Sequence, residues 1–190
     1  SREILEAVGV PREIFPRCCN TAEATGTVCA QASRETGLTA RTAVVAGGGD
    51  QVMQSIGNGA IHPGMATANI GTSGQVSFQS DRPAMNPARS TNTFCGYEKG
   101  RWFTMGAIMN AGLSLKWFNS LFETADYNQI NAQVAKVRPG SDGVIFLPYL
   151  NGERTPHVNP NLSGMFLGVN LNTGRPQMTR AVMEGVAYAL

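Results

Sequence analysis

The sequence predicts a mixed α/β fold in which helices alternate with short strands, some of them paired as hairpins. The run VVAGGGDQVMQSIG (44–57) passes from an apolar strand through three glycines into a helix. The run ATANIGTSGQVSF (66–78) places two strand-like segments around a glycine turn. The runs AGLSLKWFNSLF (111–122) and QMTRAVMEGVAYAL (177–190) carry apolar residues at helical spacing.

Composition narrows the class of protein. The chain has 190 residues, 42% of them hydrophobic, and a formal net charge of +2, which is typical of a globular domain. There is no Lys/Arg run to bind nucleic acid, no apolar stretch of about 18 residues to cross a membrane, and no signal peptide. We therefore expect a cytoplasmic protein with no nucleic-acid or membrane partner.

The cysteines and histidines form no ligand motif. They are Cys18, Cys19, Cys29, Cys95, His62 and His157. Because no CxxC pair or Cys/His cluster is present, we expect reduced thiols and no metal site. A disulfide or a zinc site is the alternative.

In the first third of the chain, a helix over 3–9 is expected to end near Gly9 and Pro11. A loop with one or two short strands follows, and CAQASRETGL (29–38) predicts a short helix that ends at Gly37. The strand at 43–46 and the helix after Asp50 come next. IGNGAIHPGM (56–65) has the glycine and proline density of a connection between domains.

The remaining elements follow from the same rules. The hairpin around 71–74 is followed by strands around a polar turn at 98–100, then by helices over 111–122 and 126–137. GVIFLPYL (143–150) predicts a buried strand, and a long loop over 151–169 leads into another short strand. The final helix has Pro176 near its first turn, where helices accept proline.

Asp50 is the first candidate for chemistry. The strand Val44-Val45-Ala46 has no polar side chain, so we expect it to be covered on both faces. The glycines after it let a ligand or another backbone approach closely, and ligands of open α/β sheets lie beyond the strand ends. The alternative is that Asp50 only caps the next helix.

A second candidate is the turn Gly71-Thr72-Ser73-Gly74. Successive backbone N–H groups in a tight turn form an anion-binding concavity, to which two hydroxyls add donors. Phosphate suits such a turn, although a plain hairpin turn is the alternative. No GxxxxGK[ST] motif is present, so the turn is not a P-loop.

Two weaker signals lie further along the chain. Gly106 and Gly112 flank the predicted start of a helix, where a nucleotide could approach closely. The loop YLNGERTPHVNP (149–160) carries Glu153, Arg154 and His157. It is either a solvated loop with an internal Glu–Arg pair or a structural clasp near a cleft. An acid, a hydroxyl-rich turn and a glycine-spaced helix start together suit a two-domain phosphotransferase.

The ordered set of these motifs resembles the FGGY family of carbohydrate kinases, and within it the xylulokinase branch. The matching stretches cover nearly the whole chain: TGLTARTAVVAGGGDQ, ANIGTSGQV, GAIMNAGLSLKWF, PYLNGERTPHVNPNLSGMFLGV and TRAVMEGVAYAL. The resemblance implies an actin/hexokinase-like ATPase fold, built from ribonuclease-H-like domains around a cleft. It also implies ATP, Mg²⁺ and a small-molecule sugar substrate, with D-xylulose as the first choice.

Site residues follow from the resemblance by motif match. It implies that Asp50 is the catalytic base and contacts the sugar, with Gln51 as a polar sugar contact. The remaining matches are assigned to phosphate or nucleotide binding: Gly71, Thr72, Ser73, Gly112 and Lys116.

The resemblance also implies a domain organisation. Residues 1–62 would be the C-terminal part of the sugar-binding domain, and residues 63–190 the first part of the nucleotide-binding domain. The family's N-terminal phosphate loop and its later adenosine motif have no match here. We therefore expect an internal piece of a kinase of about 500 residues, inactive by itself. A gluconate, ribulose or glycerol kinase, a non-catalytic ATPase-fold module and a homodimer of the complete protein stay open.

Overall fold

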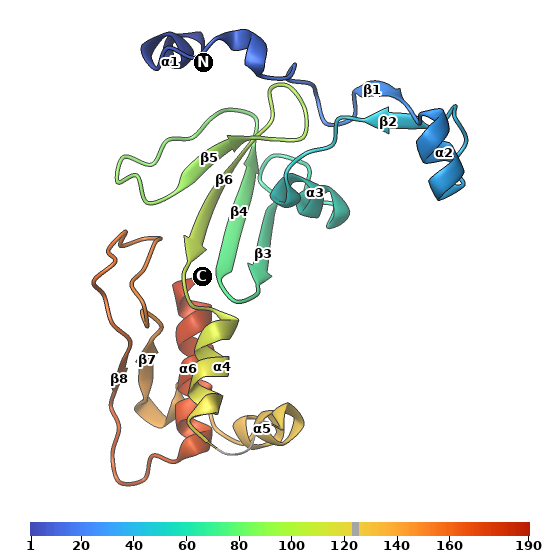
Figure 1. The fold of residues 1–190 in the computed structure, drawn as a ribbon. Coiled ribbons are helices and arrows are strands. Elements are labelled where there is room, and N and C mark those ends of the chain that lie inside the picture. The colour runs from blue at the N-terminus through green and yellow to red at the C-terminus, as the bar shows by residue number, and fades with distance from the viewer. Residues whose placement is uncertain (123–125) are drawn as a thin grey trace.

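The computed structural model describes residues 1–122 and 126–190. It contains both helices and strands, so the mixed α/β class predicted from the sequence is confirmed (Figure 1). The helices are α1 (Arg2–Ala7), η1 (Arg12–Ile14), α2 (Ala30–Thr36), α3 (Asp50–Gly57), α4 (Gly112–Ser120), α5 (Tyr127–Val134), η2 (Ser141–Gly143) and α6 (Arg175–Ala189). The strands are β1 (Ala24–Thr27), β2 (Ala43–Val45), β3 (Ala66–Ile70), β4 (Gly74–Ser80), β5 (Asn92–Cys95), β6 (Trp102–Ile108), β7 (Ile145–Leu147) and β8 (Met165–Leu167).

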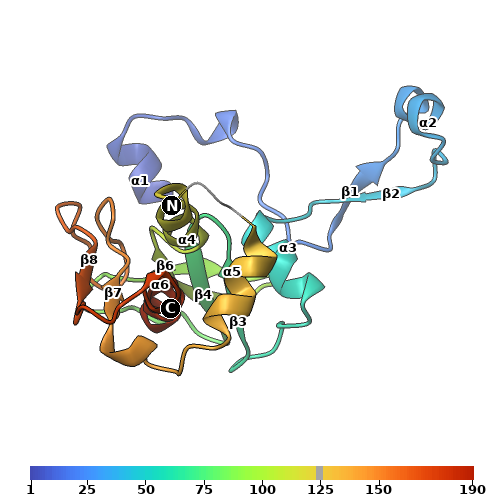
Figure 2. The same cartoon turned by 90° about the horizontal axis from the view of Figure 1, so that it is seen from below.

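The N-terminal segment forms an arm. β1 and β2 pair as an antiparallel ribbon, which together with α2 stands away from the central sheet in both views (Figures 1 and 2). The expectation that the strand Val44-Val45-Ala46 is covered on both faces is wrong for the described structure. Val44 is 43% exposed and Val45 is 52% exposed, because no other described element packs on the ribbon.

The central sheet is antiparallel throughout, in the order β3-β4-β6-β5. The predicted hairpin is confirmed: β3 and β4 are joined by the turn at 71–74, with Ile70 paired to Gly74. The second predicted pair of strands is also present, as β5 and β6 on either side of the polar turn at 98–100. β4 and β6 pair along their whole length, so these two strands form the rigid centre to which the turn is attached.

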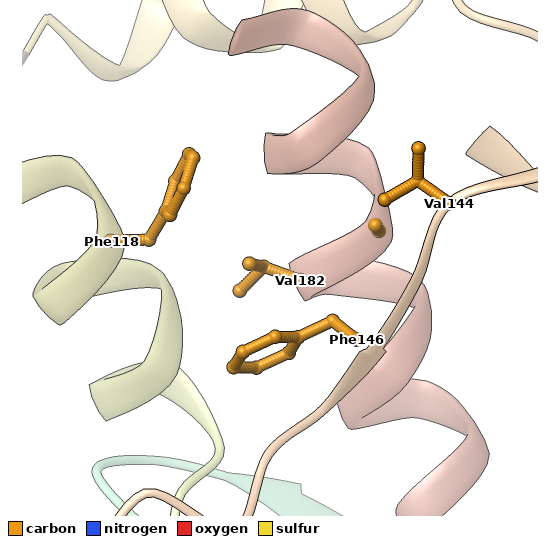
Figure 3. Packing of buried hydrophobic residues seen from close by; sticks show 5 residues of the cluster. Phe118, Val144, Phe146 and Val182 are labelled. Atoms are coloured by element: carbon orange, nitrogen blue, oxygen red, sulfur yellow. The ribbon is translucent and has the colours of Figure 1, made fainter. Parts of the chain in front are cut away.

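The main core lies between α4, α6 and β7 (Figure 3). The side chains of Phe118, Phe146 and Val182 are almost completely buried and face one another. A β-carbon at Gly185 would collide with the carbonyl oxygen of Phe146, so this glycine allows α6 to lie directly against β7. In the helix predicted over 111–122, Phe118 is buried, whereas Leu121 lies just past the end of α4 and is 60% exposed.

A smaller cluster joins the sheet to the helical layer. It contains Ile108 at the end of β6, Ala111 just before α4, and Val186 of α6. A β-carbon at Gly74 would lie 2.9 Å from Ile108 and 3.1 Å from Ala111, so the end of the β3–β4 turn packs closely on this cluster. The turn is therefore held against the beginning of α4.

Within the residues that the structure describes, no helix is both long and apolar enough to cross a membrane. All four cysteines are free thiols.

Candidate active site

Asp50 is the first residue of α3 and follows the glycines directly. Gly47 has a φ of +70°, a conformation that glycine adopts without strain, and Gly49 is the N-cap of the helix. Asp50 is therefore the first helical residue and not the N-cap, yet its carboxylate still accepts from an N–H of the first turn. Its Oδ1 accepts a hydrogen bond of 2.7 Å from the N–H of Gln51, and the side chain is otherwise exposed to solvent.

The three glycines before Asp50 meet different structural requirements. Gly47 supplies the left-handed turn, whereas a β-carbon at Gly48 would lie 3.1 Å from the end of the Met53 side chain. A β-carbon at Gly49 would meet nothing within 4 Å. The open space that the sequence predicts beside the carboxylate is thus present at Gly49.

A buried hydrogen bond joins the sheet to α3. Gln79 of β4 donates from Nε2 to Ser55 Oγ at 3.2 Å, and this contact is buried. Ser55 in turn donates to the carbonyl of Gln51 at 2.9 Å, one helical turn earlier. The side chain of Gln51 makes no hydrogen bond within the described part of the chain. Hydrogen bonds thus link the backbone of Gln51 to the sheet through Ser55. The carboxylate of Asp50 and the side-chain amide of Gln51 are available to a ligand.

The turn at 71–74 is bound to α4 through its carbonyl groups. The carbonyl oxygens of Gly71 and Thr72 accept hydrogen bonds from backbone N–H groups at the beginning of the helix, and Ser73 accepts one from Gly71 at 2.9 Å. The contacts with the helix are Gly112 N to Gly71 O (2.8 Å), Ala111 N to Thr72 O (3.0 Å) and Leu113 N to Thr72 O (3.2 Å). The turn is therefore held by α4 as well as by the two strands that it joins.

The donors of the same turn remain free. Within the described residues, neither the backbone N–H nor the hydroxyl of Thr72 or Ser73 makes a hydrogen bond. Thr72 is exposed and Ser73 is half-buried. The turn thus offers two backbone amides and two hydroxyls, and the carbonyls of its first three residues already accept hydrogen bonds. Such a set of donors favours an anion.

Gly112 and Lys116 lie one helical turn apart on α4. A β-carbon at Gly112 would lie only 2.6 Å from the carbonyl oxygen of Gly71. The close approach that the sequence predicts at this glycine is therefore made by the β3–β4 turn itself. Lys116 is exposed and has no ion pair among the described residues, so its ammonium is available near the beginning of the helix.

The need for glycine at position 106 is likewise explained by a close contact within the chain. A β-carbon there would lie 3.1 Å from the methyl group of Thr155. The small residue on β6 thus admits the loop over 152–160 rather than leaving an open approach.

The same loop resolves the two interpretations of Glu153. Its side chain is 4% exposed, and Oε1 accepts hydrogen bonds from the N–H of Met109 at 2.8 Å and from the N–H of Arg154 at 2.6 Å. No ion pair joins Glu153 to the guanidinium of Arg154 in the described structure. His157 instead faces Tyr149, with 3.1 Å between Nε2 and the phenolic oxygen. The clasp interpretation is supported, and the solvated Glu–Arg pair is not.

The structure brings only some of the predicted residues together. The turn residues and Gly112 are in direct contact, with Lys116 one helical turn beyond. No hydrogen bond or ion pair between described residues joins Asp50 or Gln51 to the turn. α3 is attached near the end of β4 at Gln79, whereas the turn lies at the other end of that strand. The acid and the anion site are therefore separate parts, and a substrate would have to connect them.

Sequence reasoning missed how Glu153 and Thr155 act. The letters GERTP mark the loop, but an acidic residue in a polar loop gives no sign that its carboxylate is buried. The partner of Glu153 is a backbone N–H 44 residues earlier, which no local pattern reveals. Among the described residues, no group of three His, Cys, Asp or Glu side chains could hold a metal ion.

Comparison with family models matches both parts of the chain. Residues 1–57 match the N-terminal domain, and residues 66–190 the C-terminal domain, of the FGGY family of carbohydrate kinases. A xylulose kinase of Lactococcus lactis is 33% identical over the whole chain, which spans 38% of that protein. A gluconokinase of Bacillus subtilis is 30% identical over 99% of the chain, which spans 39% of that protein.

Solved structures agree with these relatives. A structure described as a xyloylose kinase from Brucella ovis aligns with all of the chain at a TM-score of 0.91 and 31% identity, and the chain covers 39% of it. A gluconate kinase from Lactobacillus acidophilus aligns at a TM-score of 0.89 and 28% identity, again over the whole chain and 39% of that protein. The chain thus spans less than two fifths of each of these four relatives.

Proposed function

This chain belongs to the FGGY family of carbohydrate kinases and shares their actin-like ATPase fold, and we propose that the complete protein carrying it phosphorylates D-xylulose. The product would be D-xylulose 5-phosphate, and ATP would be the phosphate donor. Xylulose kinases support this choice, because they are the relatives with 33–34% identity over most or all of the chain.

The observation that carries the proposal is the hydrogen bonding of the β3–β4 turn. Its carbonyls are bound to one another and to α4, while the amides and hydroxyls of Thr72 and Ser73 are free. A phosphate group needs this arrangement, since donors without competing acceptors bind an anion best. In this proposal Gly71, Thr72 and Ser73 bind the phosphates of the nucleotide, in ADP as in ATP, and Gly112 keeps the turn packed on α4.

The sugar would be bound and activated at the other part of the site. Asp50 would accept the proton of the attacking hydroxyl, and Gln51 would hydrogen-bond a neighbouring hydroxyl. An exposed carboxylate at the first turn of a fixed helix can do this, since general bases act within hydrogen-bond reach of the proton they remove. ATP, when bound, supplies the phosphoryl group, and Lys116 would contribute positive charge near its phosphates.

Mg²⁺ is part of the proposal only as the usual companion of ATP. The described residues offer no cluster of acidic or histidine ligands, so they do not fit a metal site of their own. We therefore assign no metal ligand and derive no step through a metal in this chain.

The division into domains follows the same proposal. Residues 1–62 would complete the sugar-binding domain, and residues 63–190 would begin the nucleotide-binding domain. Asp50 and the turn would then lie on different domains, consistent with the absence of any direct contact between them in the described structure.

The test is sugar phosphorylation by the complete protein, comparing wild type with Asp50→Asn and Asp50→Ala. Loss of the base should lower kcat by about 10²-fold or more, because general-base catalysis contributes about 10²–10⁴-fold. Stability should change little, since among the described residues the only partner of the carboxylate is the adjacent N–H of Gln51. Glu3→Gln is the matched control, an exposed acid in the first turn of α1. Near-normal turnover of Asp50→Asn would move the base elsewhere.

Gluconate is the second candidate substrate. Gluconokinase relatives at 30% identity and a gluconate kinase structure at a TM-score of 0.89 favour it specifically. A panel of xylulose, gluconate, ribulose and glycerol, with kcat/KM for each, separates these options. A protein that phosphorylates none of them, and whose function survives Asp50→Ala, would be a non-catalytic module of the same fold.

A further inference from the structure

The loop over 152–160 is closed on itself and forms a rigid unit. Glu153 and Asn159 exchange backbone hydrogen bonds of 2.9 Å in both directions. The N–H of Gly152 donates to the carbonyl of Leu162 at 3.0 Å, and a β-carbon at Gly152 would collide with the backbone of Pro160 at 2.8 Å. The two residues that contact the sheet, Glu153 and Thr155, are thus held by a backbone with little freedom.

This unit binds the end of β6, beyond the point where β5 stops pairing. β5 reaches only Met105 of β6. Further along, the N–H of Thr155 donates to the carbonyl of Ala107 at 3.0 Å, and the hydroxyl of Thr155 accepts from the N–H of Ala107 at 3.1 Å. Glu153 then accepts from the N–H of Met109 at 2.8 Å. The loop therefore bonds the part of β6 that β5 does not reach, just before the chain enters α4.

Only one residue separates this contact from the anion site. Met109 is followed by Asn110 and then by Ala111, whose N–H donates to the carbonyl of Thr72. Asn110 is completely buried, and its carbonyl accepts a hydrogen bond from Ser114 Oγ at 2.9 Å. A shift of Met109 would be passed to Ala111 and Gly112, the residues that hold the turn.

The two oxygens of Glu153 differ in their contacts. Oε2 is buried and has no hydrogen-bond partner among the described residues, as is also true of both polar side-chain atoms of Asn110. The position of Glu153 is therefore defined by Oε1, which accepts from the N–H groups of Met109 and Arg154.

We propose that Glu153 is a positioning residue for the phosphate-binding turn, acting through Met109 and the beginning of α4. The proposal rests on the kinase function proposed above. Glu153 does not touch substrate; it holds the backbone from which Ala111 and Gly112 fix the carbonyls of the turn. The donors of Thr72 and Ser73 then keep the orientation in which they meet a phosphate.

The experiment compares Glu153→Ala and Glu153→Gln in the complete protein. Glu153→Ala removes the acceptor and should raise KM for ATP and Kd for ADP by about tenfold, since hydrogen bonds to a charged group are among the stronger ones. KM for the sugar should change little, because Asp50 and Gln51 lie on α3. Glu153→Gln keeps an acceptor oxygen for Met109 and should stay within about threefold of wild type for both ligands.

Glu184→Ala is the matched control for simple destabilisation. Glu184 also accepts a hydrogen bond from a backbone N–H, that of Gly140 at 3.1 Å, but it clasps the η2 segment and has no contact with the turn. It should lower the melting temperature without raising Kd for ADP. If Glu153→Ala does not fold, Thr155→Val removes a weaker contact of the same loop and should raise Kd for ADP in the same direction.

The outcomes separate the two proposals. Equal changes for both ligands, or a change in melting temperature alone as for Glu184→Ala, would reduce the loop to a structural support. Loss of ADP binding in Glu153→Gln as large as in Glu153→Ala would also overturn the acceptor role. A wild-type protein that binds ADP but phosphorylates no sugar would defeat the proposed function, while the dependence of ADP binding on Glu153 would still support the positioning role.

Discussion

In residues 1–49, all of which the structure describes, two α-helices and a two-stranded ribbon form without one buried side chain. The residues of both core clusters, by contrast, lie between Ile108 and Val186. Both regions follow the same local rules of capping, turn and strand pairing. The arm therefore shows that local patterns determine which element forms, whereas the packing partners determine whether its apolar face is buried.

The first prediction tests this difference where it is largest. Phe146→Ala should destabilise the protein by about 3–5 kcal/mol, because it opens a cavity among side chains that cannot collapse together. Phe146 is 2% exposed, and its ring is stacked on Trp117 at a centroid distance of 6.2 Å and tilted against Phe166 at 4.7 Å. Chemical denaturation of wild type and variant measures the loss.

Phe15→Ala is the matched control in the arm. Phe15 is 47% exposed and follows the short helix η1, so its loss should change stability by no more than about 0.5 kcal/mol. Similar losses for the two phenylalanines would show that the contrast between the regions does not exist in solution.

The second prediction concerns pH and a carboxylate that links two elements. Glu184 accepts hydrogen bonds from Arg180 Nε at 2.7 Å, from Ser141 Oγ at 2.8 Å and from the N–H of Gly140. Burial by itself raises the pKa of Glu184, but these hydrogen bonds and the charge of Arg180 outweigh burial and leave the pKa below its ordinary value. The contact holds the η2 segment against α6.

The sign of the pH effect follows from that direction. Because the folded state holds the proton less tightly than the unfolded state, Glu184 stabilises the fold above its ordinary pKa of about 4.3 and loses this contribution as the pH falls through the folded value. Glu184→Gln should therefore lower stability at pH 7, and the gap to wild type should narrow on acidification. Denaturation midpoints between pH 7 and pH 3 give the measurement.

Glu23 provides the comparison in the arm. Its pKa is also lowered, first by the N–H of Asn20 and then by Arg17 at 2.6 Å, but the pair lies open to solvent. Water and salt screen such a pair, so Glu23→Gln should change the pH dependence much less than Glu184→Gln. A larger effect at Glu23 would contradict the importance given to burial.

Much of the fold could be predicted because its signals are local. The hairpin at 71–74, the helix beginning after Gly49 and the proline at the start of α6 each depend on a few neighbouring residues. Burial could not be predicted in the same way. The apolar run at 44–46 is typical of a covered strand, yet its cover has to come from elements far away in the sequence.

The candidate site divides along the same line. Asp50 and the turn were recognisable because glycines and hydroxyls mark them in the sequence. That the carbonyls of the turn bind α4, and that Gly112 contacts the backbone of Gly71, depends on residues about 40 positions apart. The buried carboxylate of Glu153 is the extreme case, since the sequence left an exposed ion pair and a clasp both open, and one partner of the carboxylate is the backbone N–H of Met109, just after β6.

The smallest expected effect is the most informative about the arm. Val45→Ala should change the stability of this chain by no more than about 0.5 kcal/mol, because Val45 is 52% exposed on a ribbon that no other described element covers. The same truncation at Val182, which is fully buried, should cost about 2 kcal/mol or more.

Repeating both substitutions in the complete protein sharpens the comparison. If the stability lost by Val45→Ala in the complete protein approaches the loss for Val182→Ala, the ribbon is covered in that protein, as the apolar pattern of its sequence predicts. An unchanged small cost would mean that the apolar residues of β2 serve strand pairing alone.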